Sequence, residues 1–94
     1  MIATTDAAMT DPLSPLAKAV RHLEAGDWQA AHAIVQKDSS TKGCWAHGIV
    51  HLIEGDLDNA QYWYRRARRP LPHLDTVAAE IAALKDALDR DRKP

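Results

Sequence analysis

The sequence predicts an all-α protein made of two antiparallel helical hairpins and a C-terminal capping helix. Three observations support this fold class. Apolar residues recur every three or four positions along most of the chain, as on one face of a helix. No segment alternates apolar and polar residues with the period of two that marks a half-buried strand. The dipeptide Gly-Asp occurs at positions 26 and 55, where glycine can end one helix and aspartate can cap the next.

Length and composition predict one soluble domain. The 94 residues are 46% hydrophobic and 27% charged, which suits a single small core. We expect residues 1–10 to form a flexible N-terminal arm and residues 11–94 to form a single helical domain. No apolar run approaches the roughly 18 residues that span a bilayer, so no membrane partner is expected. A lone cysteine, Cys44, and an N-terminus without the pattern of a secretory signal predict a cytoplasmic location.

The first two helices are expected near residues 13–25 and 28–37. Asp11 or Ser14 can cap the first helix, and Asp27 can cap the second. The first helix places four apolar residues on one face: Leu13, Leu16, Val20 and Leu23. The second helix does the same with Trp28, Ala31, Ile34 and Val35. Both stripes predict helices that bury one side.

The third helix, near residues 42–54, has two distinct faces. One is apolar and contains Trp45, Ile49, Leu52 and Ile53. The other contains Cys44, His47, Gly48 and His51. The fourth helix is expected near residues 57–69, capped by Asp56 and ended by Pro70 and Pro72. Its inward stripe is predicted to be Leu57, Ala60, Tyr64 and Ala67.

The fifth helix is expected near residues 75–90, behind a cap at Asp75. Its apolar stripe is too long to face water and contains Leu74, Val77, Ile81, Leu84 and Leu88. We expect this stripe to cover the second hairpin, or to form the interface of a symmetric homodimer.

The two Gly-Asp segments belong to a longer repeat. "HLEAGDWQAAHAIVQ" and "HLIEGDLDNAQYWYR" align at an offset of 29 residues. At this point the chain resembles the tetratricopeptide repeat (TPR). The second copy matches that motif at Gly48, Gly55, Asp56, Leu57, Ala60, Tyr64, Ala67 and Pro72, and the first copy only around Gly26, Asp27, Trp28 and Ala31. The offset is shorter than the family's roughly 34 residues, and Cys44, His47 and His51 stand where the family has large apolar side chains.

The resemblance implies a helical-repeat protein that binds a protein or peptide partner. The segments "DWQAAHAIVQ" and "EGDLDNAQYWYRRA" are also similar to a group of small bacterial proteins without an assigned function.

One candidate site is a histidine cluster. His47 and His51 lie four residues apart on one helix, a spacing that lets two imidazoles bind one ion. Cys44 lies three residues before His47, and His32 would add a further ligand if it faces this stripe. The competing interpretation is that these residues pack inside the hairpin, with a histidine hydrogen-bonded to Tyr64 or to a carbonyl. The sequence favours packing, because one helix provides an incomplete site, so no metal or other cofactor is expected.

Catalysis has no supporting constellation. A thiolate at Cys44 with His47 as its base lacks a third member, and catalytic signatures and phosphate-binding glycine loops are absent. The sequence therefore predicts that the protein is not an enzyme.

A second candidate site is a partner-binding surface on the fourth helix. Aromatic and arginine side chains dominate interface energetics, and the proposed set is Tyr62, Trp63, Arg65 and Arg66, with Trp45 and His47 as neighbours. The competing interpretation is that the arginines only complement the helix dipole and cover apolar surface. A net charge of -1 argues against a nucleic-acid partner and leaves an acidic peptide as the expected one.

The leading hypothesis is thus a small non-catalytic interaction module, monomeric or homodimeric, that binds a protein or peptide. The alternative is a small-molecule or metal-binding protein that uses His32, His47 and His51.

Overall fold

The computed structural model describes residues 14–92, which form five α-helices and one short 3-10 helix. The expected N-terminal arm, Asp11 and Leu13 lie outside the described residues. The helices are α2 (Pro15–Glu24), α3 (Trp28–Val35), α4 (Thr41–Glu54), α5 (Leu57–Arg66) and α6 (Val77–Arg92), with the 3-10 helix η1 (Leu74–Thr76) before α6. Residues 14–92 contain no strand, which confirms the all-α prediction, and each helix lies within three residues of its expected limits.

Four of the helices begin with a side-chain cap. An oxygen of Ser14, Asp27, Ser40 or Asp56 accepts a hydrogen bond from the backbone N–H three residues later, over distances of 3.0 to 3.2 Å. Each cap satisfies a backbone amide that has no partner inside the helix. The caps predicted at Ser14, Asp27 and Asp56 are confirmed. The cap predicted at Asp75 is wrong, because Asp75 lies inside η1, which begins after His73 without a side-chain cap.

Three helices end with the same backbone motif, in which one residue adopts a left-handed conformation. These residues are Gly26 (φ 81°), Gly55 (φ 89°) and Arg68 (φ 63°). In each case the next residue's N–H bonds the carbonyl five positions before it, for example Arg69 N–H to Tyr64 O at 3.0 Å. Arg68 is the only non-glycine residue among those described that has a positive φ. This turn ends α5 at Arg66, earlier than the expected residue 69.

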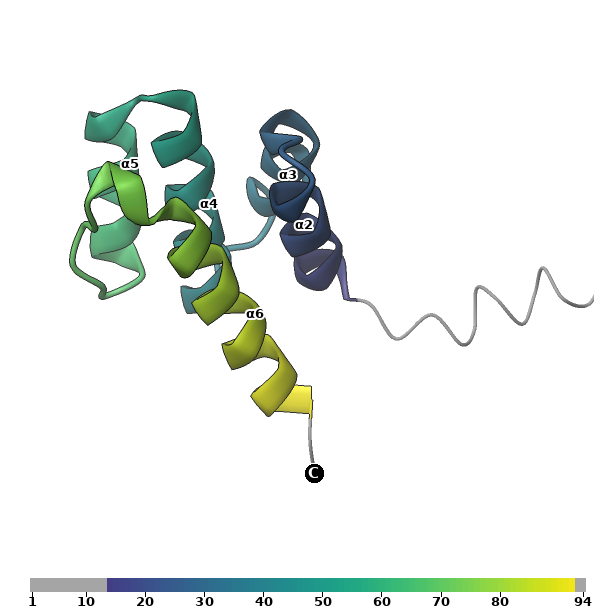
Figure 1. The fold of residues 1–94 in the computed structure, drawn as a ribbon. Helices are drawn as coiled ribbons and strands as arrows, with labels where there is room; N and C mark the ends of the chain where they lie inside the picture. Colours follow the sequence, from purple (N-terminus) through teal and green to yellow (C-terminus); the bar gives the residue numbers. More distant parts are fainter. Residues whose placement is uncertain (1–13, 93–94) are drawn as a thin grey trace, which may run out of the picture.

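The helices pack as two sequential pairs joined by α6. Helix α2 packs against α3, and α4 packs against α5, while α3 also contacts α4 (Figure 1). Helix α6 crosses in front and contacts both α4 and α2, so it covers both pairs and not only the second. Its residues Ile81 and Leu84 are buried in the core of the single chain. Helix α4 is central, and every residue from position 43 to position 52 is buried.

The Tyr64 ring of α5 packs directly against Gly48 of α4. A Cβ built on Gly48 would lie 2.5 Å from Cδ2 of the Tyr64 ring, so only glycine fits there. The Tyr64 hydroxyl donates to Glu80 Oε1 of α6 at 2.7 Å, and the Trp45 indole donates to the same oxygen at 3.0 Å. Burial, together with Glu80, raises the pKa of Tyr64, so the hydroxyl keeps its proton. One carboxylate therefore links α6 to both α4 and α5.

Two residues of the predicted apolar stripes face outward. Leu57 is 44% exposed and Leu74 is 53% exposed, although both were expected to be inside. Together with Leu71 and Pro72 they line a surface pocket beside the loop that follows α5. Leu57 is the first residue of α5 and Leu74 is the first residue of η1, so both lie at the ends of elements, at the margin of the core.

Replacing Ala60 with leucine is expected to destabilise the protein by about 2 kcal/mol, because added methylenes overpack a filled core. Ala60 is fully buried on α5. Thermal denaturation followed by circular dichroism measures the change. Ala83→Leu, at an exposed position on α6, is the matched control and should melt close to the wild type. Equal melting of the Ala60 variant and the wild type would show that α5 has room for a larger side chain.

Candidate functional site

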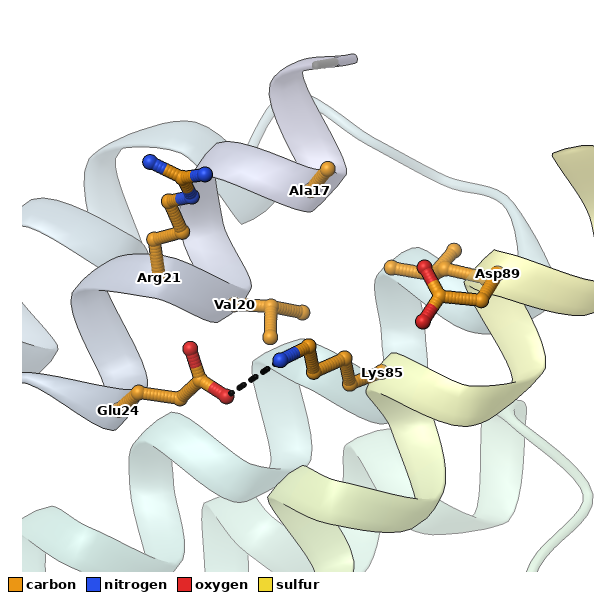
Figure 2. A pocket seen from close by; sticks show the side chains of 7 residues that line it. Ala17, Val20, Arg21, Glu24, Lys85 and Asp89 are labelled. Carbon is orange, nitrogen blue, oxygen red and sulfur yellow. Dashed lines mark ion pairs between the residues drawn. The ribbon is translucent and has the colours of Figure 1, made fainter. Parts of the chain in front are cut away.

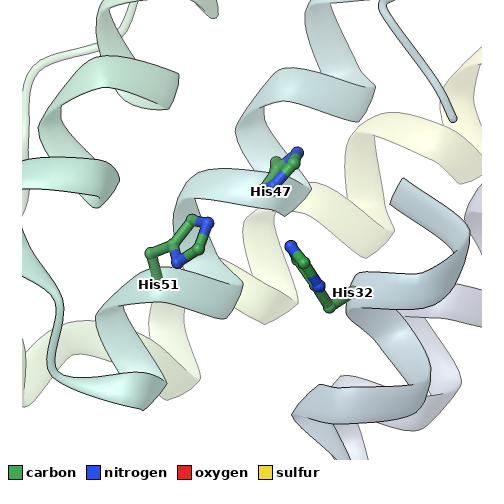
Figure 3. Close-up of side chains that lie close together, drawn as sticks. All are labelled: His32, His47 and His51. Atoms are coloured by element: carbon green, nitrogen blue, oxygen red, sulfur yellow. The ribbon is translucent and has the colours of Figure 1, made fainter. Parts of the chain in front are cut away.

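Three histidine side chains converge where α3 meets α4. His32 comes from α3, and His47 and His51 come from successive turns of α4 (Figure 3). The ring centroids lie 4.9 Å apart for His32 and His47, 5.4 Å for His32 and His51, and 5.0 Å for His47 and His51. One ring nitrogen of each residue lies within 4.8 Å of those of the other two. The structure thus places His32 next to the stripe on α4. From the sequence, His32 could be predicted as a further ligand only if it faced that stripe.

Neighbouring side chains fix the orientation of two of these rings. The Trp63 ring of α5 stacks on His47, with centroids 3.9 Å apart and planes 8° apart. His51 Nδ1 lies 2.8 Å from Glu54 Oε1, one turn further along α4. If this nitrogen carries the proton toward the carboxylate, Nε2 of His51 has a free lone pair.

His47 is the most deeply buried of the three histidines. Only 4% of its surface is exposed, and its Nδ1 has no hydrogen-bond partner. Burial, reinforced by the neighbouring His51 and His32, lowers the pKa of His47 from 6.5 to about 4. The imidazole is therefore neutral near pH 7. The hydrogen bond to Tyr64 expected from the packing interpretation is not formed by this cluster, since the Tyr64 hydroxyl donates to Glu80.

The stability of the metal-free protein is expected to fall by about 2 kcal/mol between about pH 7 and about pH 5 because of His47. Its pKa is lower in the folded chain than its ordinary value of 6.5, so below pH 6.5 the unfolded chain binds a proton that the folded chain excludes. Stability is lost as the pH falls from 6.5 toward 4. Urea denaturation across this range measures the slope. A His47→Gln variant should lose this part of the pH dependence, and an unchanged slope in that variant would contradict the assignment.

Cys44 does not join the histidines. It is a buried free thiol whose Sγ lies 3.9 Å from the carbonyl oxygen of Ser39. The candidate set His32, Cys44, His47 and His51 is therefore reduced to its three imidazoles. A second group, His51, Glu54 and Asp56, lies at the end of α4. Asp56 is already engaged as the cap of α5, and its hydrogen bonds from Asn59 lower its pKa.

The residues of the predicted partner-binding surface lie partly at the surface of the protein and partly in its interior. Tyr62, Arg65 and Arg66 are exposed on α5, and Trp63 is half-buried behind them. Tyr62 meets Trp63 edge to face at 4.9 Å, and the Arg66 guanidinium lies 5.7 Å and 5.6 Å from the two ring centroids. Tyr62, Trp63 and Arg66 thus form one cluster on α5.

The remaining two members of that set, Trp45 and His47, are buried. They are 5% and 4% exposed. The indole of Trp45 is bonded to Glu80, and the Arg69 guanidinium covers its ring at 3.6 Å. Neither residue offers a surface to a partner, because α4 is surrounded by other helices.

No arginine at the end of α5 forms an ion pair within the described part of the chain. The ion pairs found there are Lys42–Asp91, Lys85–Glu24 and Arg90–Asp86, and the contact of His51 with Glu54 is an ion pair only when the imidazole is protonated. By contrast, a cleft of about 140 Å³ between α2 and α6 contains a lysine that has an acidic partner (Figure 2). Lys85 Nζ lies 3.6 Å from Glu24 Oε2. Arg65, Arg66, Arg68 and Arg69, at the end of α5 and in the turn after it, thus have no carboxylate partner among residues 14–92.

Arg68 is the residue that the sequence analysis did not single out. It occupies the left-handed position that glycine fills after α2 and α4. The sequence has no glycine between Ala67 and Pro70 to fill that position. This absence is the signal that could have identified Arg68.

Comparison with protein-family models, with curated proteins and with solved structures found no match to this chain. Among the described helices, none combines the length and the apolar character needed to cross a membrane.

Proposed function

We propose that this protein is a small non-catalytic interaction module that binds an acidic segment of a partner protein. The proposed contact surface, here called the arginine surface, consists of Tyr62, Trp63, Arg65, Arg66 and Arg68. The observation that carries the proposal is that these arginines have no carboxylate partner within residues 14–92 and that Arg68 is held in a left-handed conformation. A side chain in this conformation costs roughly 1 kcal/mol relative to glycine. An arginine kept at a cost to the fold suggests a role outside the fold.

The chemistry of this surface favours carboxylates together with apolar side chains. A guanidinium group binds a carboxylate through two parallel hydrogen bonds. Tyr62, which is 50% exposed, adds a large contact area next to Arg66. The exposed Leu57, Leu71 and Leu74 belong to the same part of the chain and favour apolar residues in the partner. A nucleic acid fits less well, since the net charge of -1 provides no wider positive field.

We propose further that the two helix pairs form a TPR-like arrangement. Its support is the shared ending of α2 and α4, where a left-handed glycine is followed by an aspartate cap. The close approach of Gly48 to Tyr64 and the burial of Ala60 add support in the second pair. The proposed compartment is the cytoplasm, where a buried free thiol such as Cys44 persists in the reduced state.

The variant Arg65→Glu, Arg66→Glu tests the arginine surface. Fluorescence anisotropy with a labelled peptide of mixed glutamate and leucine measures binding. The variant should bind at least about tenfold more weakly, a change of roughly 1.4 kcal/mol. Its melting temperature should stay close to that of the wild type, because exposed charges contribute little to stability.

Two controls show whether binding depends on where the charges are reversed and on the charge of the peptide. Arg21→Glu, Lys37→Glu changes the net charge equally at exposed residues elsewhere and should leave the affinity unchanged. A matched lysine and leucine peptide should not bind the wild type. Equal peptide affinity for the wild type and the double variant would reject the surface. Tighter binding of a single-stranded oligonucleotide than of the acidic peptide would reject the proposed partner.

A further inference from the structure

We infer that His32, His47 and His51 form a binding site for a divalent transition-metal ion of the zinc class. The site adjoins the arginine surface through Trp63, whose ring stacks on His47, and a metal ion there goes beyond the proposed partner binding. Two helices provide its ligands, and the three side chains lie close together (Figure 3). Imidazole nitrogens suit zinc, copper, nickel and cobalt, whereas magnesium and calcium prefer oxygen ligands.

The spacing of the ring nitrogens is close to what an ion requires. Zinc–nitrogen bonds of about 2.0 to 2.1 Å in tetrahedral geometry place ligand nitrogens roughly 3.3 Å apart. One nitrogen of each histidine already lies within 4.8 Å of the others. Binding would require small rotations about the side-chain bonds, chiefly at His32, whose ring is held by neither Trp63 nor Glu54. His47 and His51 have the i, i+4 spacing that lets one helix give two ligands to one ion.

The contacts among the three rings are not those of a structural hydrogen-bond network. The imidazoles meet edge to face or stacked, and no hydrogen bond joins any two of these three described residues. His47 Nδ1 is buried and has no hydrogen-bond partner within the described part of the chain. A buried polar atom without a hydrogen bond lowers the stability of the fold. Two further imidazoles beside it do not stabilise an apolar core. A bound ion would give one nitrogen of each ring a common partner.

The surroundings supply an orienting contact of the kind that metal sites use. His51 Nδ1 lies 2.8 Å from Glu54 Oε1, which directs Nε2 of the same ring away from the carboxylate. A carboxylate in this position fixes the ring and strengthens its remaining nitrogen as a ligand. Trp63, stacked on His47 at 3.9 Å, restrains the second ring. Three histidines leave one position of a tetrahedral ion for water or a small anion.

A bound ion would also link the two helix pairs. His32 belongs to α3 in the first pair, and His47 and His51 belong to α4 in the second. We therefore expect metal binding to raise the melting temperature of the whole domain.

Isothermal titration of the metal-free full chain with Zn²⁺ tests the site, and Co²⁺ provides a visible spectrum that reports four-coordinate geometry. The wild type should bind one ion per chain. His32→Gln should abolish binding at concentrations that saturate the wild type, and because His32 is only half-buried the variant is expected to fold. Glu54→Gln should weaken binding about tenfold while keeping the stoichiometry.

The other two histidines of the chain are matched controls. His22→Gln and His73→Gln lie outside the cluster and should bind zinc as the wild type does. Circular dichroism without metal verifies that every variant is folded. Absence of stoichiometric zinc binding by the wild type would overturn the inference. Full binding by His32→Gln, or loss of binding in His22→Gln or His73→Gln, would also overturn it.

Discussion

Replacing Gly48 with alanine is expected to destabilise the protein by about 3 kcal/mol, even though the same change stabilises an ordinary helix by roughly 1 kcal/mol. The added Cβ would lie 2.5 Å from Cδ2 and 2.7 Å from Cε2 of Tyr64. The ring cannot retreat easily, because Tyr64 is 1% exposed and its hydroxyl is bonded to Glu80. Urea denaturation measures the loss.

A double-mutant cycle shows whether the ring is the cause. In a Tyr64→Ala background the clash is absent, so Gly48→Ala should be neutral or stabilising there. If Gly48→Ala costs the same with and without the tyrosine ring, the close contact between α4 and α5 is not the source of the effect.

Replacing Glu80 with alanine should destabilise the protein by about 3 kcal/mol, because two buried donors lose their acceptor. The Tyr64 hydroxyl and the Trp45 indole both donate to Glu80 Oε1. Removing the carboxylate also releases α6 from its polar contact with α4 and α5. Chemical denaturation measures the change.

Glu24→Ala is the matched control, since Glu24 forms an exposed ion pair with Lys85 at 3.6 Å. Exposed ion pairs contribute roughly 0 to 1 kcal/mol, so this variant should stay near the wild type. Equal losses for the Glu80 and Glu24 variants would contradict the role assigned to Glu80.

Features that depend on neighbouring residues in the chain were predictable from the sequence. The apolar spacing located the five helices, and short oxygen side chains identified the caps at Ser14, Asp27 and Asp56. The predicted end of α5 at residue 69 is too late, because that prediction rests on Pro70 and Pro72 as the residues that end the helix. The left-handed turn at Arg68 ends the helix at Arg66, before either proline.

Features that depend on tertiary packing were not predictable. The meeting of His32 with His47 and His51 requires α3 to pack on α4, and no local pattern encodes that contact. Trp45 and His47 were assigned to a surface, but α4 is enclosed by its neighbours on all sides. Leu57 was assigned to the core because its spacing fits the stripe, although α5 begins at the margin of the core.

The central claim is that the arginine surface serves binding at some expense to stability, and Arg68→Gly tests it most directly. Glycine relieves the left-handed strain, so the variant should gain about 1 kcal/mol in stability. It also removes a guanidinium group, so affinity for the acidic peptide should fall about fivefold, or roughly 1 kcal/mol. Arg68→Ala, which removes the guanidinium and keeps the strain, should lose the same affinity without gaining stability. A more stable Arg68→Gly variant that binds the peptide as tightly as the wild type would contradict the claim.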